Sequence, residues 1–158
     1  MKTFTVLLAA FHYLAFGFGI WSVFERGRSF KNLVKHPQEK SFIESLLRYD
    51  NLWGICGFLI LTTGLIKAFG DIEKPVAFYM KNGLFHAKLG MVFVILAIEV
   101  YVMIKLLKLR VERKKNPQFS FSDSEFRTMS LLNKIEAHLF VIVPFFAAMV
   151  ARGIGLHL

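Results

Sequence analysis

Four long apolar blocks, separated by polar stretches, constrain this chain more than any other feature of its sequence. A helix that crosses a bilayer needs about 20 mainly apolar residues. The apolar residues come in continuous blocks rather than with the period of an amphipathic soluble helix. We therefore predict an all-α integral membrane protein, a four-helix bundle that forms one domain over residues 1–158. The predicted spans are about 4–24, 52–69, 84–107 and 135–151.

The composition supports this class. The chain is 55% hydrophobic and contains 18 Phe, which is too apolar for an average soluble domain. The net charge is +9, but the basic residues lie between the spans, where membrane proteins usually carry them. We therefore expect a lipid bilayer as partner and no nucleic acid. The single Cys56 can form no internal disulfide, and a Cys-based metal site is excluded.

The first apolar block has a second interpretation, a cleaved signal peptide, because Lys2 precedes it. The block is too long for a signal core, and no small-x-small cleavage site follows it. We therefore predict a first span.

The polar connections 25–51 and 108–134 are predicted to be cytoplasmic loops. Apolar residues within the first connection predict a short amphipathic helix on the membrane surface, interrupted near Pro37. The third span is expected to continue into water until Pro117. Ser122 and Glu125 have the spacing of a capping box, which predicts a helix start near Asp123.

The distribution of basic residues predicts the orientation. The first and third connections contain six and eight Lys and Arg, whereas the opposite side contains five. The more basic side is normally cytoplasmic, so both termini are predicted to lie outside. We expect a multi-pass protein of the bacterial inner (cytoplasmic) membrane.

Polar residues within or beside the spans are the candidates for function, because ionisable groups are costly in a bilayer. The predicted outer half contains His12, His86, Lys88 and Arg152. The predicted inner half contains Asp50, Asn51, Trp53, Glu99, Asn133, Glu136 and His138.

His12 lies inside the first span. One interpretation is that its imidazole forms a hydrogen bond with a neighbouring helix. The other is that it is an axial haem ligand or a proton carrier. A haem ligand is plausible chemistry because imidazole binds haem iron and helical bundles host such cofactors. His86 is either an interfacial residue or a second ligand, but its height differs from that of His12 by roughly 6 to 10 Å. His138 is a further candidate ligand at the inner side.

Lys88 and Glu99 are the candidate catalytic residues. They lie roughly 16 Å apart along one helix face and cannot pair with each other. Lys88 either reaches outward to the interface or binds a carboxylate, such as a haem propionate or an acidic substrate. Glu99 is either protonated or needs a donor; the expected donors are Tyr13, Tyr101, Asn51 and Ser22.

The remaining inner residues have a simpler interpretation. Asn133 and Glu136 open the fourth span, where interfacial polarity is common, and they form the candidate polar cluster with Asp50, Asn51 and Trp53. Phosphate-binding glycine loops, H-E-x-x-H metal motifs and G-x-S-x-G elbows do not occur in the sequence, which excludes the enzyme classes they mark.

Several short motifs carry a resemblance to known families. The segments D-N-L-W-G (50–54), T-G-L (63–65), A-K-L-G (87–90) and A-R-G (151–153) resemble a family of small bacterial membrane proteins of unknown function. A His in the first span, G-L-F-H-A-K-L at 83–89 and L-N-K-I-E at 132–136 resemble HemJ-type protoporphyrinogen oxidases and CopD-like copper-resistance proteins.

The HemJ resemblance implies a four-helix bundle that binds haem b through His12, with Lys88 essential and a porphyrinogen or electron partner. Apart from this resemblance, His86 and Arg152 are candidate cofactor-binding residues because of their position in the predicted outer half. In HemJ-type proteins the fourth span usually carries N-E-[IV]-P, whereas Asn133 to Glu136 here read N-K-I-E with no Pro following.

Three hypotheses follow. The first is a haem-b-binding redox protein acting on a porphyrin-type molecule or passing electrons, that is, an oxidoreductase if it is an enzyme. The second is a non-enzymatic accessory or assembly protein whose polar residues only join helices; a homo-oligomer is compatible with both. The third, copper handling, lacks a cluster of soft ligands among the six Met.

Overall fold

The structure is a computed structural model that describes residues 2–155. Four of its helices are long: α1 (Lys2–Lys35), α2 (Lys40–Phe69), α4 (Gly83–Lys115) and α5 (Asp123–Ala151); α3 (Val76–Met80) is short. Each long helix is long and apolar enough to cross a membrane. The predicted all-α membrane bundle is therefore confirmed, and the orientation of the termini stays a prediction.

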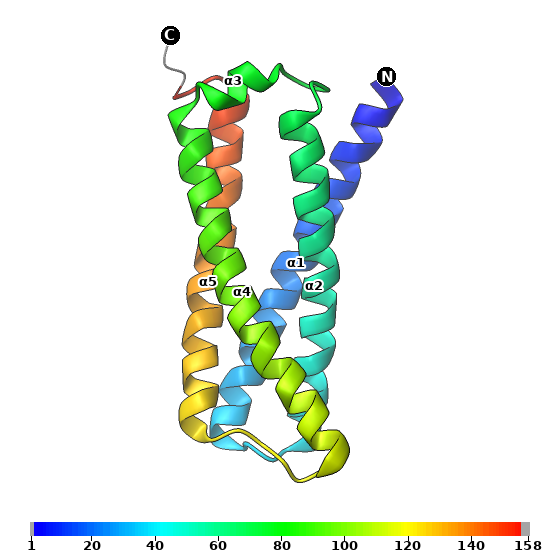
Figure 1. Cartoon of the computed structure of the whole chain (residues 1–158), viewed down its shortest axis with the longest axis vertical. Coiled ribbons are helices and arrows are strands. Elements are labelled where there is room, and N and C mark those ends of the chain that lie inside the picture. The colour runs from blue at the N-terminus through cyan, green and yellow to red at the C-terminus, as the bar shows by residue number, and fades with distance from the viewer. Residues whose placement is uncertain (1, 156–158) are drawn as a thin grey trace.

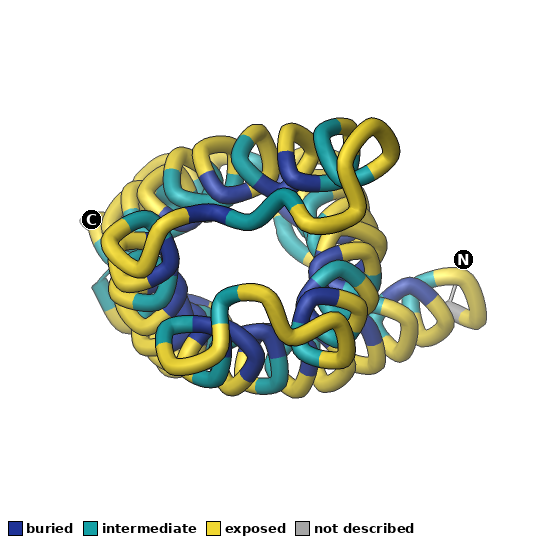
Figure 2. Tube along the Cα trace, turned by 90° about the horizontal axis from the view of Figure 1, so that it is seen from below, coloured by how far each residue is buried: buried dark blue, intermediate teal, exposed yellow. Residues whose placement is uncertain are grey.

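The long helices form a bundle in which α1 packs against α2 and α5, and α4 packs against α5. The parts of the trace coloured as buried lie mainly on the inward sides of the helices, and the exposed parts lie mainly on the outward sides (Figure 2). The start of α1 and the end of α5 lie at one end, which we call the termini end (Figure 1). The connections 36–39 and 116–122 lie at the opposite end, the loop end.

The helices extend well beyond the predicted spans at the loop end, so the prediction of a separate amphipathic surface helix in 25–50 is wrong. Its apolar residues instead continue α1 and α2 and pack against the extended ends of α4 and α5. Burial against other helices removes more apolar surface from water than contact with a membrane surface. The core at this end consists of Phe30, Leu33, Ile43, Leu46, Val102, Leu106, Leu109, Phe121, Phe126 and Met129.

The predicted helix boundaries around the last connection are confirmed. α4 ends at Lys115 with Asn116 as its C-cap, directly before Pro117. α5 begins at Asp123, where Ser122 and Glu125 form a reciprocal capping box. These signals act through local backbone groups, which is why they can be recognised without knowledge of the tertiary fold.

At the termini end, α3 and residues 152–155 lie beside the start of α4. The connection between α2 and α4 contains α3, whose aromatic side chains pack near Phe85. Asn82 caps α4 through Phe85 N and donates to the carbonyl of Ile154 at 3.0 Å. Outside the spans, burial and the Glu73 carboxylate raise the pKa of Tyr79.

Large apolar side chains cover the outside of the bundle, among them Phe11, Phe58, Phe93 and Phe145. A water-soluble protein rarely exposes such continuous apolar surface. A lipid bilayer would cover this apolar surface and keep it out of water.

Candidate functional site

A single arginine connects the four long helices in the interior of the bundle. Arg26 on α1 is fully buried. Its Nε donates to Asn133 Oδ1 on α5 at 2.7 Å, and its Nη2 donates to Glu136 Oε2 on the same helix at 2.6 Å. Its Nη1 donates to Asp50 Oδ1 on α2 at 3.1 Å and to Glu99 Oε2 on α4 at 2.8 Å. The guanidinium thus bonds to a polar residue on each of the other three long helices.

A second arginine extends this network toward the surface. Arg110 Nη2 on α4 donates to the other oxygen of Asp50 at 3.1 Å and to the carbonyl of Leu47 at 3.1 Å. Asn133 Nδ2 donates to the carbonyl of Val23 at 3.1 Å. We define the Arg26 cluster as Arg26, Asp50, Glu99, Arg110, Asn133 and Glu136.

The Arg26 cluster lies between two apolar layers. Val23 on one side belongs to the middle core with Trp53 and Phe140, and Phe30 on the other side belongs to the loop-end core. Few water molecules compete for hydrogen bonds in such surroundings, so each of these bonds is stronger than it would be at a surface.

Three buried polar atoms at the Arg26 cluster make no hydrogen bond with any residue that the structure describes. They are Glu136 Oε1, Trp53 Nε1 and Arg110 Nε. Buried polar atoms without partners are uncommon in native proteins and require an explanation.

A groove of about 430 Å³ gives the Arg26 cluster access to the outside between α2 and α4. Asp50, Asn51, Glu99 and Arg110 form its polar part. The rest of its lining is mainly apolar and consists of Gly54, Ile55, Phe58, Leu59, Met103 and Leu107. A small polar species can therefore reach Glu99 from the α2–α4 side.

Gly27 makes room for the amide that holds Arg26. A Cβ at this position would lie 2.8 Å from Asn133 Nδ2. Gly27→Ala is therefore expected to push Asn133 away from Arg26 and to destabilise the protein by about 1–3 kcal/mol, the usual effect of overpacking. Thermal unfolding in detergent, followed by circular dichroism, measures this.

Gly17→Ala on the same helix is the control, because a Cβ there meets nothing within 4 Å. If both variants unfold at the same temperature, the close approach of Gly27 and Asn133 has no energetic importance.

His12 occupies a separate site toward the termini end. Its Nδ1 lies 2.7 Å from Thr63 Oγ1 on α2. The Thr63 hydroxyl donates to the carbonyl of Leu59 at 2.5 Å, so its oxygen accepts from His12 Nδ1–H. The imidazole is then the tautomer with a free lone pair on Nε2. Gly64 lies beside the ring, and a Cβ there would be 3.5 Å from His12 Cε1.

Two lysine side chains lie near enough to His12 for their positive charges to act on it. The charges of Lys67 on α2 and Lys88 on α4 both act on the imidazole. Lys67 forms an ion pair with Glu73 at 3.1 Å. Lys88 is half-buried and lies over the ring of Phe85 at 5.0 Å, and no carboxylate of residues 2–155 pairs with it. The His12 site therefore has an ammonium group available for an anionic ligand.

The other predicted ligands lie apart from His12. His86 is exposed, and its Nε2 lies 2.9 Å from the carbonyl of Met80. His138 is exposed on α5, and its Nδ1 lies 2.6 Å from the carbonyl of Lys134 on its own helix. Arg152 is exposed at the end of α5.

The structure brings together only part of the predicted polar cluster. Asp50, Asn133 and Glu136 meet, and Trp53 lies beside them, whereas the exposed Asn51 lines the groove. Glu99 belongs to the same cluster. Its donor is Arg26, which was not among the expected donors; Ser22, one of those, donates to the carbonyl of Gly19 instead.

Sequence reasoning missed Arg26 and Arg110 because both were counted as loop residues. The signal for Arg26 was present: Val23, Phe30 and Leu33 occur at helical spacing around it. Had α1 been extended past residue 24, Arg26 would have fallen on its apolar, inward face.

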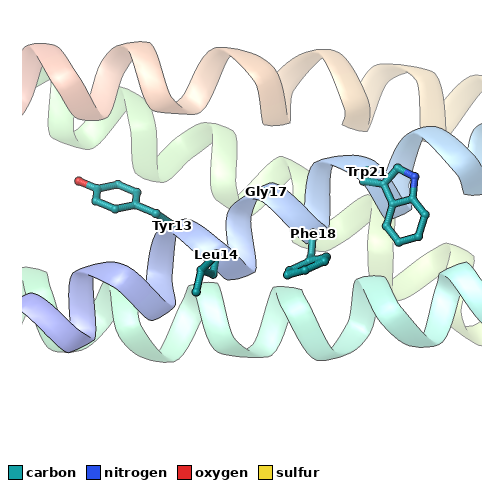
Figure 3. Close-up of a pocket in the computed structure, with 5 residues that line it drawn as sticks. All are labelled: Tyr13, Leu14, Gly17, Phe18 and Trp21. Atoms are coloured by element: carbon teal, nitrogen blue, oxygen red, sulfur yellow. The ribbon is translucent and has the colours of Figure 1, made fainter.

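A second depression in the surface is mainly apolar. It measures about 320 Å³ and is lined by α1 alone (Figure 3), through Tyr13, Leu14, Gly17, Phe18 and Trp21. Among residues 2–155, no group of three or more His, Cys, Asp or Glu side chains is placed to hold a metal ion. A copper site built from such a group therefore has no candidate there.

Comparison with known proteins identifies a family. The family model described as "Predicted membrane protein (DUF2214)" matches residues 4–155. No curated protein and no solved structure matches the chain. The resemblance to a membrane protein family of unknown function is thus confirmed, whereas a relationship to HemJ-type or CopD-like proteins is not shown.

Proposed function

The chain belongs to the DUF2214 family of membrane proteins, and we propose that it is a redox protein that binds haem b at His12. The observation that carries this proposal is the hydrogen bond from His12 to Thr63. It fixes the ring and leaves Nε2 free, as in haem and metal sites where a second group holds the other nitrogen of a ligating histidine.

The surroundings of His12 fit a haem. The ring is half-buried among helices rather than exposed, and helical bundles commonly hold cofactors between their helices. Lys88 supplies a cation for a propionate. Among residues 2–155 no second histidine contacts His12, and we propose His12 as the haem ligand that the described residues supply. When bound, haem supplies one-electron chemistry, and its partner is either a porphyrinogen or another electron carrier.

The proposed location is the bacterial inner membrane, with the termini end outside. The Lys and Arg count supports it, since the connections at the loop end carry most of the positive charge. The His12 site then lies in the outer half of the membrane and the Arg26 cluster in the inner half.

An absorption spectrum of the protein purified in mild detergent tests haem binding. We expect a Soret band that shifts on reduction with dithionite. A flat spectrum that persists after haem is added back would contradict the proposal. A porphyrinogen oxidation assay on the haem-containing protein then separates an oxidase from an electron carrier.

A second candidate function is a non-enzymatic accessory or assembly protein. The Arg26 cluster favours it, because this cluster joins helices through polar contacts and needs no cofactor to do so. This alternative predicts a folded protein with no visible absorption band and the same stability with and without haem.

Thr63→Val tests the observation behind the first proposal. Valine keeps the shape of the side chain but cannot accept from His12 Nδ1. Loss of such a supporting group commonly weakens binding by about 10- to 100-fold, and we expect this loss in a haem titration. The control is Thr62→Val, since Thr62 is exposed on the same helix and its hydroxyl bonds its own helix backbone, at Phe58 O. Equal haem affinity of the two variants would show that Thr63 does not position the ligand.

A further inference from the structure

Two carboxyl groups of the Arg26 cluster lie side by side. Glu99 and Glu136 accept from the two neighbouring terminal nitrogens of the same guanidinium, at 2.8 and 2.6 Å. They come from different helices, α4 and α5, and meet at this one guanidinium. Two carboxyl groups in such a position can hydrogen-bond each other only when one of them carries a proton.

The charges of the Arg26 cluster do not balance. α1 contributes Arg26, α2 contributes Asp50, α4 contributes Glu99 and Arg110, and α5 contributes Glu136. The other polar groups facing these carboxyls, Asn133 and the Trp53 indole, are neutral. Lys105, the next basic residue on α4, pairs with Glu125 instead. Two cations therefore face three carboxyl groups.

An uncompensated charge in the interior of a membrane bundle is strongly unfavourable, and ionisable groups in such surroundings take up or release a proton. Glu136 is fully buried, and its Oε1 has no hydrogen-bond partner among residues 2–155. A proton between the two glutamates would remove the excess charge and give this oxygen a partner.

From this arrangement we infer that Glu99 and Glu136 share one proton, which exchanges through the groove between α2 and α4. The ligand of this site is the proton itself. Glu99 lines the groove and its side chain is 17% exposed, whereas that of Glu136 is 0% exposed. Glu99 is therefore the member that transfers the proton to and from water, and Glu136 is the inner member.

The inference does not depend on haem binding. No residue of the Arg26 cluster contacts His12 in the part of the chain that the structure describes, and the two sites lie in different halves of the bundle. A protein without haem would still contain the proton site, and loss of the proton site would leave the His12–Thr63 contact intact.

Infrared spectroscopy of the purified protein tests the shared proton. At neutral pH the wild type is expected to show the carbonyl stretch of a protonated carboxylic acid, which shifts in deuterium oxide. Glu99→Gln and Glu136→Gln should each remove this band, because two carboxylates then face two guanidiniums. Glu112→Gln, on the same helix as Glu99 but outside the Arg26 cluster, should leave the band unchanged.

The wild-type spectrum alone shows whether a protonated carboxylic acid is present, even if a variant fails to fold. A wild type without the band overturns the inference, and so does a band that survives in both glutamine variants. A band lost in both and kept in Glu112→Gln supports it.

The exchange route is tested by filling the groove. Gly54 lines it, and a Cβ at Gly54 or Gly57 meets nothing within 4 Å, but Gly57 does not line the groove. We expect Gly54→Phe to keep the carboxylic acid band and to slow its deuterium exchange at least about tenfold relative to Gly57→Phe. Equal exchange in the two variants would overturn the route.

Discussion

Replacing Arg26 with glutamine is expected to destabilise the protein by about 3–5 kcal/mol, the usual effect of removing one member of a buried charge network. Glutamine is shorter and neutral. It leaves Asp50, Glu99 and Glu136 without the buried guanidinium that they share. Unfolding of the purified protein in detergent, followed by circular dichroism, measures the loss.

Arg28→Gln is the matched control for this prediction. Arg28 lies two residues along the same helix, its side chain is 73% exposed, and its carboxylate partner is Glu25 one turn away. Exposed pairs of this kind contribute about 0–1 kcal/mol. Similar stability losses in the two variants would show that Arg26 is not the centre of the interior.

Replacing His12 with alanine is expected to abolish the haem absorbance of the purified protein. The variant loses Nε2, the His12 nitrogen that the bond to Thr63 leaves free to bind iron. The protein should remain folded, because the His12–Thr63 hydrogen bond is a single contact in the N-terminal part of α1. The comparison is made on equal amounts of wild type and variant, each given the same haem.

His138→Ala serves as the control for His12, since that ring is exposed and bonded to its own helix. It should keep the wild-type spectrum. A full spectrum in His12→Ala would remove His12 as the ligand, and a spectrum lost only in His138→Ala would move the site to α5.

The sequence was sufficient to predict the fold class, because four apolar blocks of membrane-crossing length allow few other arrangements. It also located the end of α4 before Pro117 and the start of α5 at Asp123, since both depend on local backbone chemistry. The extension of the helices beyond the spans was not predicted. There the apolar residues follow the periodicity of soluble helices, and their partners come from distant parts of the chain.

The candidate site was predicted only in part for a related reason. Asp50, Glu99, Asn133 and Glu136 were recognised as polar residues in or near the spans, but the residue that joins them was not. Arg26 follows the first span directly, where a basic residue is commonplace. Only the continuation of α1 to Lys35 turns it inward, and that continuation depends on packing with the other helices.

The central claim of this account is that Arg26 joins helices that do not otherwise pack against each other closely. α1 packs against α2 and α5, and α4 packs against α5, so the bond from Arg26 to Glu99 reaches across the bundle. A double-mutant cycle of Arg26→Gln and Glu99→Gln, read from the free energies of unfolding, tests this most directly. We predict a coupling of at least about 1 kcal/mol, within the range for residues in direct contact. Additivity within about 0.5 kcal/mol, as for distant sites, would contradict it.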